Sequence, residues 1–278
     1  MTKTLTYAPL PSRALIAVSG QDWRSFLQGL ITQDVETLAV GEARFGALLT
    51  PQGRLLYDLF AIGRDDGCWL DVLAEHRAAI LQRLMMYRLR AKVELAVDET
   101  PVSILFPGGG TSPGGAWAPD PRLPALGWRG YGVGAPAGAL AAGEAERETQ
   151  KLALGVPGPA DWGSDKTYPI EANFDLLNGI DFKKGCFVGQ ETTSRMKRRG
   201  QVKNRMLPIA FEGPALAPGA EVLAGELRAG VVTSAGAGRA MALLRLDRIE
   251  GAALTVDGRP ARVERPAWFL DALKAEPA

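Results

Sequence analysis

The chain has 278 residues, of which 46% are apolar and 23% charged, and its formal net charge is +1. These values are typical of a folded globular protein, and the near-neutral balance argues against a nucleic-acid-binding protein. No apolar run reaches the ~18 residues of a membrane span, and residues 1–6 lead into no signal-peptide core. We therefore expect a cytoplasmic protein of about two domains with no membrane partner.

The first part of the chain predicts strands alternating with helices, which favours mixed α+β sheets. Asp22 is a plausible N-cap for the first helix. Helical spacing places Ile80, Leu81, Leu84 and Met85 on the apolar side of the second helix. In chain order, the predicted elements are a strand over 10–20, a helix from 21, a hairpin of 45–50 and 54–62, a strand over 68–73, a helix over 75–89, and strands over 92–97 and 102–106.

The second part begins with a Gly- and Pro-rich segment, 107–125, which predicts a loop-rich connection. A helix over 143–154 and an irregular stretch over 162–187 follow. Short strands separated by turn residues then predict a small antiparallel barrel or sandwich. These strands are expected over 206–211, 220–223, 227–233, 240–246 and 254–263. We accordingly divide the chain into an α+β region, 1–203, and a C-terminal domain, 204–278.

One cysteine, Cys186, lies in an unusual setting within the block Lys184-Gly185-Cys186-Phe187-Val188-Gly189-Gln190-Glu191. Between residues 181 and 205 there are eight Lys or Arg residues against two acids. Nearby cations favour the thiolate, which is the nucleophilic and metal-binding form of cysteine. Glycines on both sides let the backbone approach closely or adopt positive φ. The pattern predicts a reactive site near the junction of two domains, and the alternative is a small buried residue.

The other candidate metal-binding or nucleophilic residues are few. Cys68 is expected to be a core residue of a strand, and His76 is the only histidine. A protein-built zinc site would draw three or four such ligands, so none is predicted, and a structural disulfide would be unusual in the cytoplasm. The locally concentrated positive charge favours an anionic small molecule or an acidic partner surface as the ligand.

The block 184–191 resembles the K-G-C-[FY]-x-G-Q-E signature of the YgfZ-type folate-binding proteins, which are relatives of the glycine-cleavage T-protein. Residues 26–35, 51–58 and 169–173 and Gly200 also resemble that family. The resemblance implies T-protein-like α+β modules, ferredoxin-like in part, around a central channel that takes tetrahydrofolate, plus a C-terminal antiparallel β-barrel. It also implies a folate-linked role in the assembly or repair of iron–sulfur enzymes, with iron–sulfur proteins or cluster-assembly factors as partners.

The resemblance also suggests roles for single residues. Cys186 would be a reactive thiolate that meets an iron–sulfur cluster, a persulfide or a partner cysteine. Glu171 would accept paired hydrogen bonds from the pterin, or else is a surface carboxylate. Arg195 or Lys197 would hold the carboxylates of the folate tail, or else belongs to a solvated charge run. Gln190, counted with the folate-binding residues, would orient the loop.

The hairpin over 51–58 departs from the T-protein pattern. Where T-proteins that transfer the aminomethyl group carry two adjacent acids, this chain has Tyr57-Asp58. Asp58 either faces the channel or caps a strand end at the surface. Because methylene transfer needs an acid beside the folate nitrogens, the loss of one carboxylate argues against that activity. An accessory protein without turnover of its own is therefore favoured over an aminomethyltransferase.

Two further alternatives remain open. A demethylase or sarcosine-oxidase-type relative would usually be fused to a flavin domain, and this sequence contains no dinucleotide fingerprint. A scaffold whose basic segment docks an acidic protein would show no saturable folate binding, and its association would weaken with salt.

Overall fold

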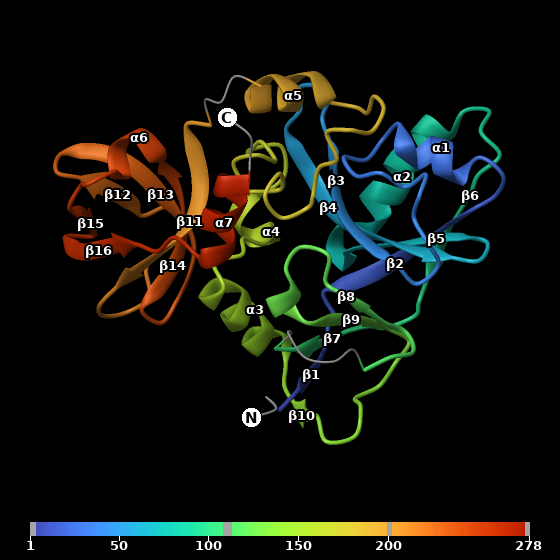
Figure 1. Cartoon of the computed structure of the whole chain (residues 1–278), viewed down its shortest axis with the longest axis horizontal. Coiled ribbons are helices and arrows are strands. Elements are labelled where there is room, and N and C mark those ends of the chain that lie inside the picture. The colour runs from blue at the N-terminus through green and yellow to red at the C-terminus, as the bar shows by residue number, and fades with distance from the viewer. Residues whose placement is uncertain (1–3, 108–112, 199–201, 276–278) are drawn as a thin grey trace. The chain divides into compact units, whose positions relative to one another are not determined.

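A computed structural model describes residues 4–107, 113–198 and 202–275 of the chain (Figure 1). The chain forms two compact units. The first consists of Met1–Arg147 and Leu177–Gln190, and the second of Glu148–Leu176 and Glu191–Ala278. The chain therefore passes between the units three times, and the block around Cys186 lies just before the last passage.

Within the described residues, the first unit contains two five-stranded sheets. One has the order β10-β1-β7-β9-β8, with β1 (Thr6–Pro9), β7 (Val102–Phe106), β8 (Trp117–Pro119), β9 (Trp128–Tyr131) and β10 (Leu140–Ala141). The other has the order β3-β4-β5-β2-β6, with β2 (Arg13–Ser19), β3 (Ala43–Leu49), β4 (Leu55–Arg64), β5 (Gly67–Leu73) and β6 (Glu94–Asp98). The predicted hairpin is confirmed as the antiparallel pair β3–β4, in which Phe45 is opposite Phe60.

Helices α1 (Trp23–Gln28) and α2 (Arg77–Arg88), the latter preceded by the short 3-10 helix η1 (Ala74–His76), pack on the second sheet. Leu27, Ile80 and Leu84 are fully buried in this core. The predicted apolar side of α2 is wrong at Met85, which is 52% exposed. The reason is that Ile80 and Leu84, one helical turn apart, already meet the sheet, and the residue after Leu84 turns away from it.

Asp22 precedes α1, but its side chain does not cap the helix. Its carboxylate Oδ2 instead accepts a hydrogen bond from the backbone N of Lys92, at 2.8 Å. The predicted capping role is therefore wrong, because a donor from a distant part of the chain reaches this carboxylate.

The connection predicted to be loop-rich contains ordered structure. Strand β8 lies within 107–125, and the 3-10 helix η2 (Pro124–Leu126) begins at the end of this connection. Strands β1 and β9 were not predicted. Residues 108–112 of this connection lie outside the described residues. Strands β1 and β9 are short and show no clear alternation of apolar and polar residues. Both are formed by pairing with β7, which lies elsewhere in the sequence.

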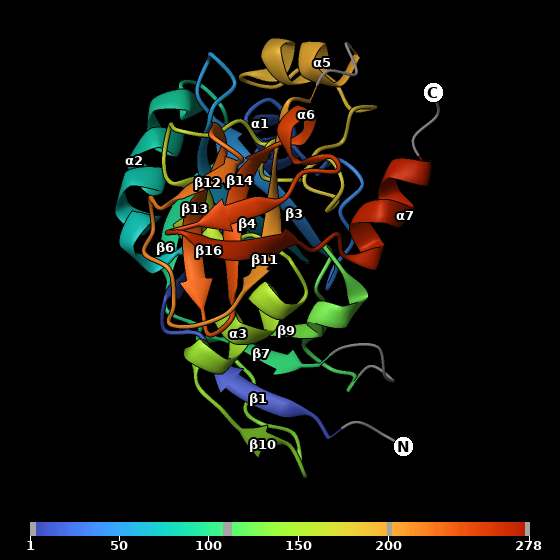
Figure 2. The same ribbon diagram turned by 90° about the vertical axis from the view of Figure 1, so that its left-hand side faces the viewer.

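The second unit is built around a closed antiparallel barrel with the strand order β11-β14-β13-β12-β15-β16 (Figure 2). Its strands are β11 (Asn204–Phe211), β12 (Glu221–Ala224), β13 (Leu227–Gly236), β14 (Arg239–Arg245), β15 (Leu254–Val256) and β16 (Arg259–Val263). The strand predicted over 254–263 is a tight hairpin, in which Asp257 and Gly258 have φ of 50° and 73°. Such a turn requires positive φ at both central residues.

The remaining helices are α3 (Glu144–Ala153), α4 (Pro159–Trp162), α5 (Gln190–Arg198), α6 (Leu246–Ile249) and α7 (Ala267–Ala275). None of the helices in the described ranges is both long enough and apolar enough to cross a membrane.

Strand β11 begins at the predicted domain boundary, but the unit that contains the barrel also includes residues before it. Asn173 donates through Nδ2 to the carbonyl of Met206 at 2.7 Å. Arg205 of β11 forms a two-point ion pair with the carboxylate of Asp175. These contacts bind the 148–176 segment to the barrel, so the compact unit is larger than 204–278.

A buried ionic network joins the two sheets of the first unit. Asp71 of β5 is fully buried, and its Oδ1 accepts a hydrogen bond from Arg13 Nε of β2 at 2.6 Å. Its Oδ2 accepts from Arg129 Nε and the Tyr131 hydroxyl, at 3.0 and 3.1 Å, and both donors lie on β9 of the other sheet. Burial by itself raises the pKa of Asp71, but Arg129 and Arg13 outweigh it, so the pKa lies below its ordinary value. Asp71 is therefore an anion shared by both sheets.

We predict that Asp71→Asn lowers the free energy of unfolding by about 3–5 kcal/mol, because it leaves Arg13 and Arg129 buried without their shared counter-charge. Urea unfolding measures this change. Asp66→Asn, which alters an exposed carboxylate of the same unit 3.9 Å from Arg64, should leave the unfolding midpoint unchanged. Equal effects of the two substitutions would show that the network does not stabilise the unit.

Candidate functional site

Three segments far apart in sequence meet around Thr32, a fully buried residue of the first unit. The Thr32 hydroxyl donates to the carbonyl of Gly179 at 2.6 Å and accepts from the backbone N of Ala47 at 2.9 Å. The Thr32 carbonyl accepts from the backbone N of Asp181 at 3.0 Å. This residue therefore joins the segment after α1, strand β3 and the start of the cysteine segment.

The block around Cys186 is fixed to the segment after α1. Val188 N donates to the carbonyl of Gly29 at 3.1 Å. The ammonium group of Lys184 donates to the carbonyls of Ile31 and Gln33, at 2.7 and 2.8 Å. Burial lowers the pKa of Lys184 to about 8. This cation therefore anchors the loop through backbone carbonyls.

Gly189 allows the block to touch the turn between β3 and β4. Its φ is +82°, and a Cβ there would lie 2.6 Å from the carbonyl oxygen of Thr50 and 3.0 Å from Cα of Gly53. Gly185, in contrast, has no atom within 4 Å of the position a Cβ would take. The two glycines near the cysteine therefore have different roles. Only Gly189 has a positive φ and backbone atoms so close that a side chain would clash with them.

We predict that Gly189→Ala destabilises the first unit by about 1–3 kcal/mol, since the residue would be strained and would clash with backbone. Gly185→Ala is the matched control and should leave the stability unchanged. Urea unfolding compares the two variants. If Gly189→Ala were as stable as Gly185→Ala, the contact with the β3–β4 turn would not fix the loop.

The two cysteines have opposite environments. Cys186 is exposed, so the alternative that it is a small buried residue is wrong. Cys68 is buried in β5, as predicted, and burial raises the pKa of its thiol to about 12. Among the described residues, no group of three or more His, Cys, Asp or Glu side chains forms a metal site. The accessible thiol is therefore Cys186.

Asp58 lies within β4, is 5% exposed, and accepts a hydrogen bond from Arg13 Nη1 at 3.0 Å. The alternative that it caps a strand end at the surface is wrong, because Arg13 draws it into the buried ionic network. Glu171 is half-buried: its Oε2 accepts from Tyr168 N at 3.0 Å and its Oε1 from Asn204 Nδ2 at 2.9 Å. Both carboxylates therefore have structural partners already.

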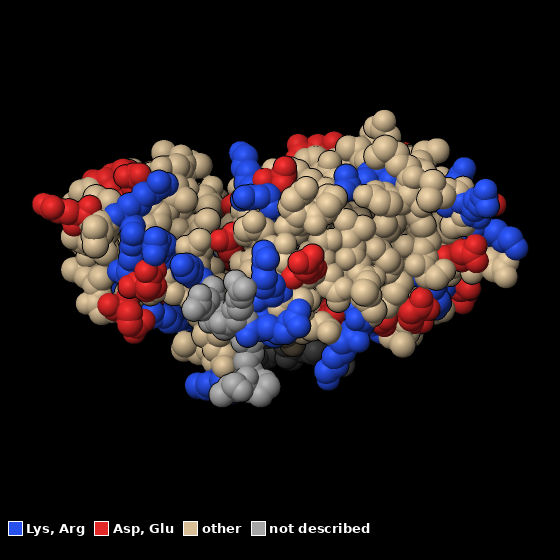
Figure 3. Space-filling model, turned by 90° about the horizontal axis from the view of Figure 1, so that it is seen from above, with Lys and Arg blue, Asp and Glu red and all other residues tan. Residues whose placement is uncertain are grey.

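Helix α5 carries the remaining predicted residues. Gln190 is its first residue and donates through its backbone N to the carbonyl of Phe187 at 3.1 Å. Glu191 lies in the first turn, and Arg195 and Lys197 lie in the last turn. This distribution suits the helix dipole, which favours anions at the N-terminus and cations at the C-terminus. Figure 3 shows Lys and Arg side chains on the face that carries α5.

The predicted residues are divided between the two units. Asp58, Lys184, Gly185, Cys186, Gly189 and Gln190 belong to the first unit, and Glu171, Glu191, Arg195 and Lys197 belong to the second. Arg199, which contributes to the basic segment, and Gly200 lie outside the described residues.

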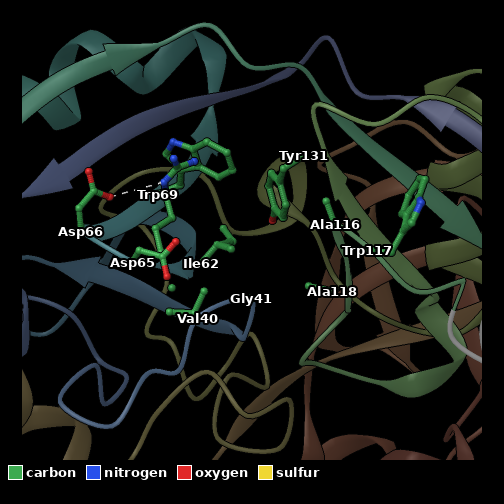
Figure 4. Close-up of a pocket in the computed structure, with 13 residues that line it drawn as sticks. Val40, Gly41, Ile62, Asp65, Asp66, Trp69, Ala116, Trp117, Ala118 and Tyr131 are labelled. Atoms are coloured by element: carbon green, nitrogen blue, oxygen red, sulfur yellow. Dashed lines mark ion pairs between the residues drawn. The ribbon is translucent and has the colours of Figure 1, made fainter.

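The first unit also contains a cavity of about 530 Å³ that the sequence did not indicate (Figure 4). Trp69, Trp117 and Tyr131 line it, and the Trp69 and Tyr131 rings are 5.9 Å apart. Their strands, β5, β8 and β9, belong to both sheets, so no local pattern connects them. A second cavity, of about 270 Å³, lies in the second unit and is lined in part by Lys151 and Asp161. Cys186 lines neither of these two cavities.

The fold has a known counterpart. The crystal structure of the glycine cleavage system aminomethyltransferase T from Bartonella henselae aligns with a TM-score of 0.76, over 96% of this chain and 86% of that chain, at 18% identity. The fold is that of the glycine-cleavage T-protein. Residues 203–271 match the family described as CAF17, C-terminal beta-barrel domain. The predicted α+β class with a C-terminal antiparallel barrel is therefore confirmed.

Curated relatives share the sequence more closely. The chain is 33% identical over 237 residues to "Iron-sulfur cluster assembly factor IBA57 homolog, mitochondrial" of Neurospora crassa, which covers 74% of this chain and 54% of that protein. It is 29% identical over 277 residues to "Iron-sulfur cluster assembly factor IBA57, mitochondrial" of Homo sapiens, over 87% of this chain and 78% of that protein. The chain thus spans little more than half the length of the Neurospora crassa relative.

Thr32 is the residue that sequence reasoning missed. No periodicity or charge pattern distinguishes it, and its only signal was its place within 26–35, one of the segments that resemble the folate-binding family. The resemblance therefore indicated the segment, while the hydrogen bonds of Thr32 show what the segment does: it holds the cysteine loop.

Proposed function

We propose that this protein is a YgfZ-type, tetrahydrofolate-binding accessory factor for the assembly or repair of iron–sulfur enzymes, acting through Cys186. The observation that carries the proposal is the exposed thiol of Cys186 on a loop that is fixed at both ends. The two relatives described above are named as iron–sulfur cluster assembly factors, which supports the same role.

The number of cysteines limits the chemistry. Iron–sulfur clusters are usually held by four cysteine thiolates. Cys68 is buried, so this chain offers one accessible thiol. Cys186 can therefore supply at most one ligand to a cluster or one partner for a thiol or persulfide, and the remaining ligands come from the client protein. The proposed role is therefore that of an accessory factor that contributes one thiol to chemistry completed by its client protein.

Folate binding is supported by the T-protein fold and by Glu171, a carboxylate that the sequence indicated. Glu171 is half-buried and already accepts hydrogen bonds from Tyr168 and Asn204. A carboxylate has about four acceptor sites, so Glu171 retains capacity for the N–H groups of a pterin, whereas Asp58 is buried beside Arg13. Arg195 and Lys197 of α5 would bind the anionic glutamate tail.

The cellular compartment stays a prediction. The sequence predicts a cytoplasmic protein, whereas the names of the relatives place those proteins in mitochondria.

We predict that Cys186→Ser abolishes rescue of an iron–sulfur-deficient strain while the protein remains folded, because serine keeps the size of the side chain but not its sulfur chemistry. Cys68→Ala, which removes the buried thiol, is the control and should still rescue. A thiol reagent should modify one cysteine in the native wild-type protein and none in native Cys186→Ser. Full rescue by Cys186→Ser would refute the role of this residue.

We also predict saturable binding of tetrahydrofolate, measured by calorimetric titration of the full chain. Glu171→Gln should weaken binding by about tenfold or more, because the amide loses the charge that attracts the N–H donors. Gly185→Ala serves as the control with unchanged affinity. Absence of saturable binding would favour a scaffold. Formation of methylenetetrahydrofolate from a lipoyl-bound intermediate would instead show the aminomethyltransferase activity.

A further inference from the structure

Helix α2 is apolar on two opposite sides. Its inner side carries Ile80 and Leu84, which are fully buried. The helix packs on the sheet that contains β2 and β6 (Figure 1). Its solvent side lacks charge over three turns. We call this solvent side, together with the residue that follows the helix, the α2 outer face; it consists of Ala78, Ala79, Gln82, Met85, Met86 and Leu89, all of them exposed.

The large residues of the α2 outer face are strongly exposed. Met85 is 52% exposed, Met86 63% and Leu89 87%. A helix at the surface of a globular protein normally presents polar or charged residues to water. Exposed apolar side chains that are grouped together mark interaction sites. The apolar stripe on the solvent side of α2 therefore indicates a surface that a binding partner covers.

The charges of the helix segment itself have one sign. From Arg77 to Lys92 the chain contains five cations and no acid. Arg77 pairs with Glu99 at 3.1 Å. Arg88 and Arg90 are exposed at the end of the helix, next to the methionines. The α2 outer face therefore combines an apolar centre with a positive border.

We infer that the α2 outer face binds an acidic amphipathic helix of a partner protein. The apolar side of that helix would cover the methionines, and its Asp or Glu residues would meet Arg88 and Arg90. Ala78 and Ala79 allow close approach of a second helix at one end of the stripe. Met85 and Met86 are flexible and adapt to the shape of the partner at the other end.

Two other occupants fit the face less well. A second copy of this chain, related by two-fold symmetry, would bring the arginine borders of both copies together, and like charges oppose such a contact. A membrane-surface helix inserts bulky residues such as Trp, Phe and Leu. Ile80 and Leu84 of α2 are buried in the core, and the outer face offers one such bulky residue, Leu89, beside two Ala and two Met.

The test uses defined probes and the full chain. Two fluorescein-labelled helical peptides share one apolar face of Leu and Met and carry either Glu or Lys on their flanks. Fluorescence anisotropy measures their affinities at several salt concentrations. We expect the Glu peptide to bind at least about tenfold more tightly than the Lys peptide and its affinity to fall as salt rises. Equal affinity for the two peptides would overturn the inference.

Variants locate the binding surface. The double variant Met85→Glu/Met86→Glu should weaken binding of the Glu peptide by about tenfold or more, because it buries like charges and removes apolar contact. Leu227→Glu is the matched control: Leu227 is 63% exposed on β13, and its substitution should change nothing. Gln82→Glu alters one exposed residue of the same face, so it can be tested if the double variant does not fold. It should also weaken binding of the Glu peptide.

The competing occupants are tested with the same proteins. Sedimentation with vesicles of mixed phosphatidylserine and phosphatidylcholine should be the same for wild type and Gln82→Glu. Analytical ultracentrifugation should give one species for both. Vesicle binding that Gln82→Glu abolishes would assign the face to a membrane, and a dimer that it dissociates would assign it to a second copy. Either result would overturn the inference.

Discussion

The first unit depends on charges that are buried together. Asp71 receives hydrogen bonds from Arg13 in its own sheet and from Arg129 in the other sheet. Arg129 also lies 3.8 Å from the ring of Phe60 and 3.7 Å from the carboxylate of Asp120. Charges removed from water are tolerated only when their partners are held close, so the two sheets have little freedom to move apart.

Strand β4 connects this buried ionic network to the candidate site. Asp58 belongs to the same network through Arg13, and it lies on the strand that follows the turn touched by Gly189. The sheet therefore holds the turn, and the turn together with Thr32 holds the cysteine loop. A sheet with little freedom to move and a loop fixed to it explain how the exposed Cys186 is held in a defined position, although it lines neither of the two cavities described above.

The cysteine block shows how far a motif can be interpreted from sequence. Its cations suggested a positively charged setting for Cys186, but the nearest one in the motif, Lys184, binds backbone carbonyls of the segment after α1. Its two glycines look equivalent in sequence, yet only Gly189 meets other backbone atoms. Charge and glycine content indicated the location of the site, whereas the separate role of each residue depended on atoms from other segments.

The sequence by itself determined the β3–β4 hairpin, the barrel strands, the burial of Cys68 and the segment that presents Cys186, because each depends on local alternation, turn residues or a contiguous motif. Only the tertiary structure decided the pairing of β1 and β9 with β7, the position of Thr32 and the sharing of Asp71 between sheets. Those features consist of contacts between residues more than 50 positions apart or in strands too short to show a period, and no local pattern contains that information.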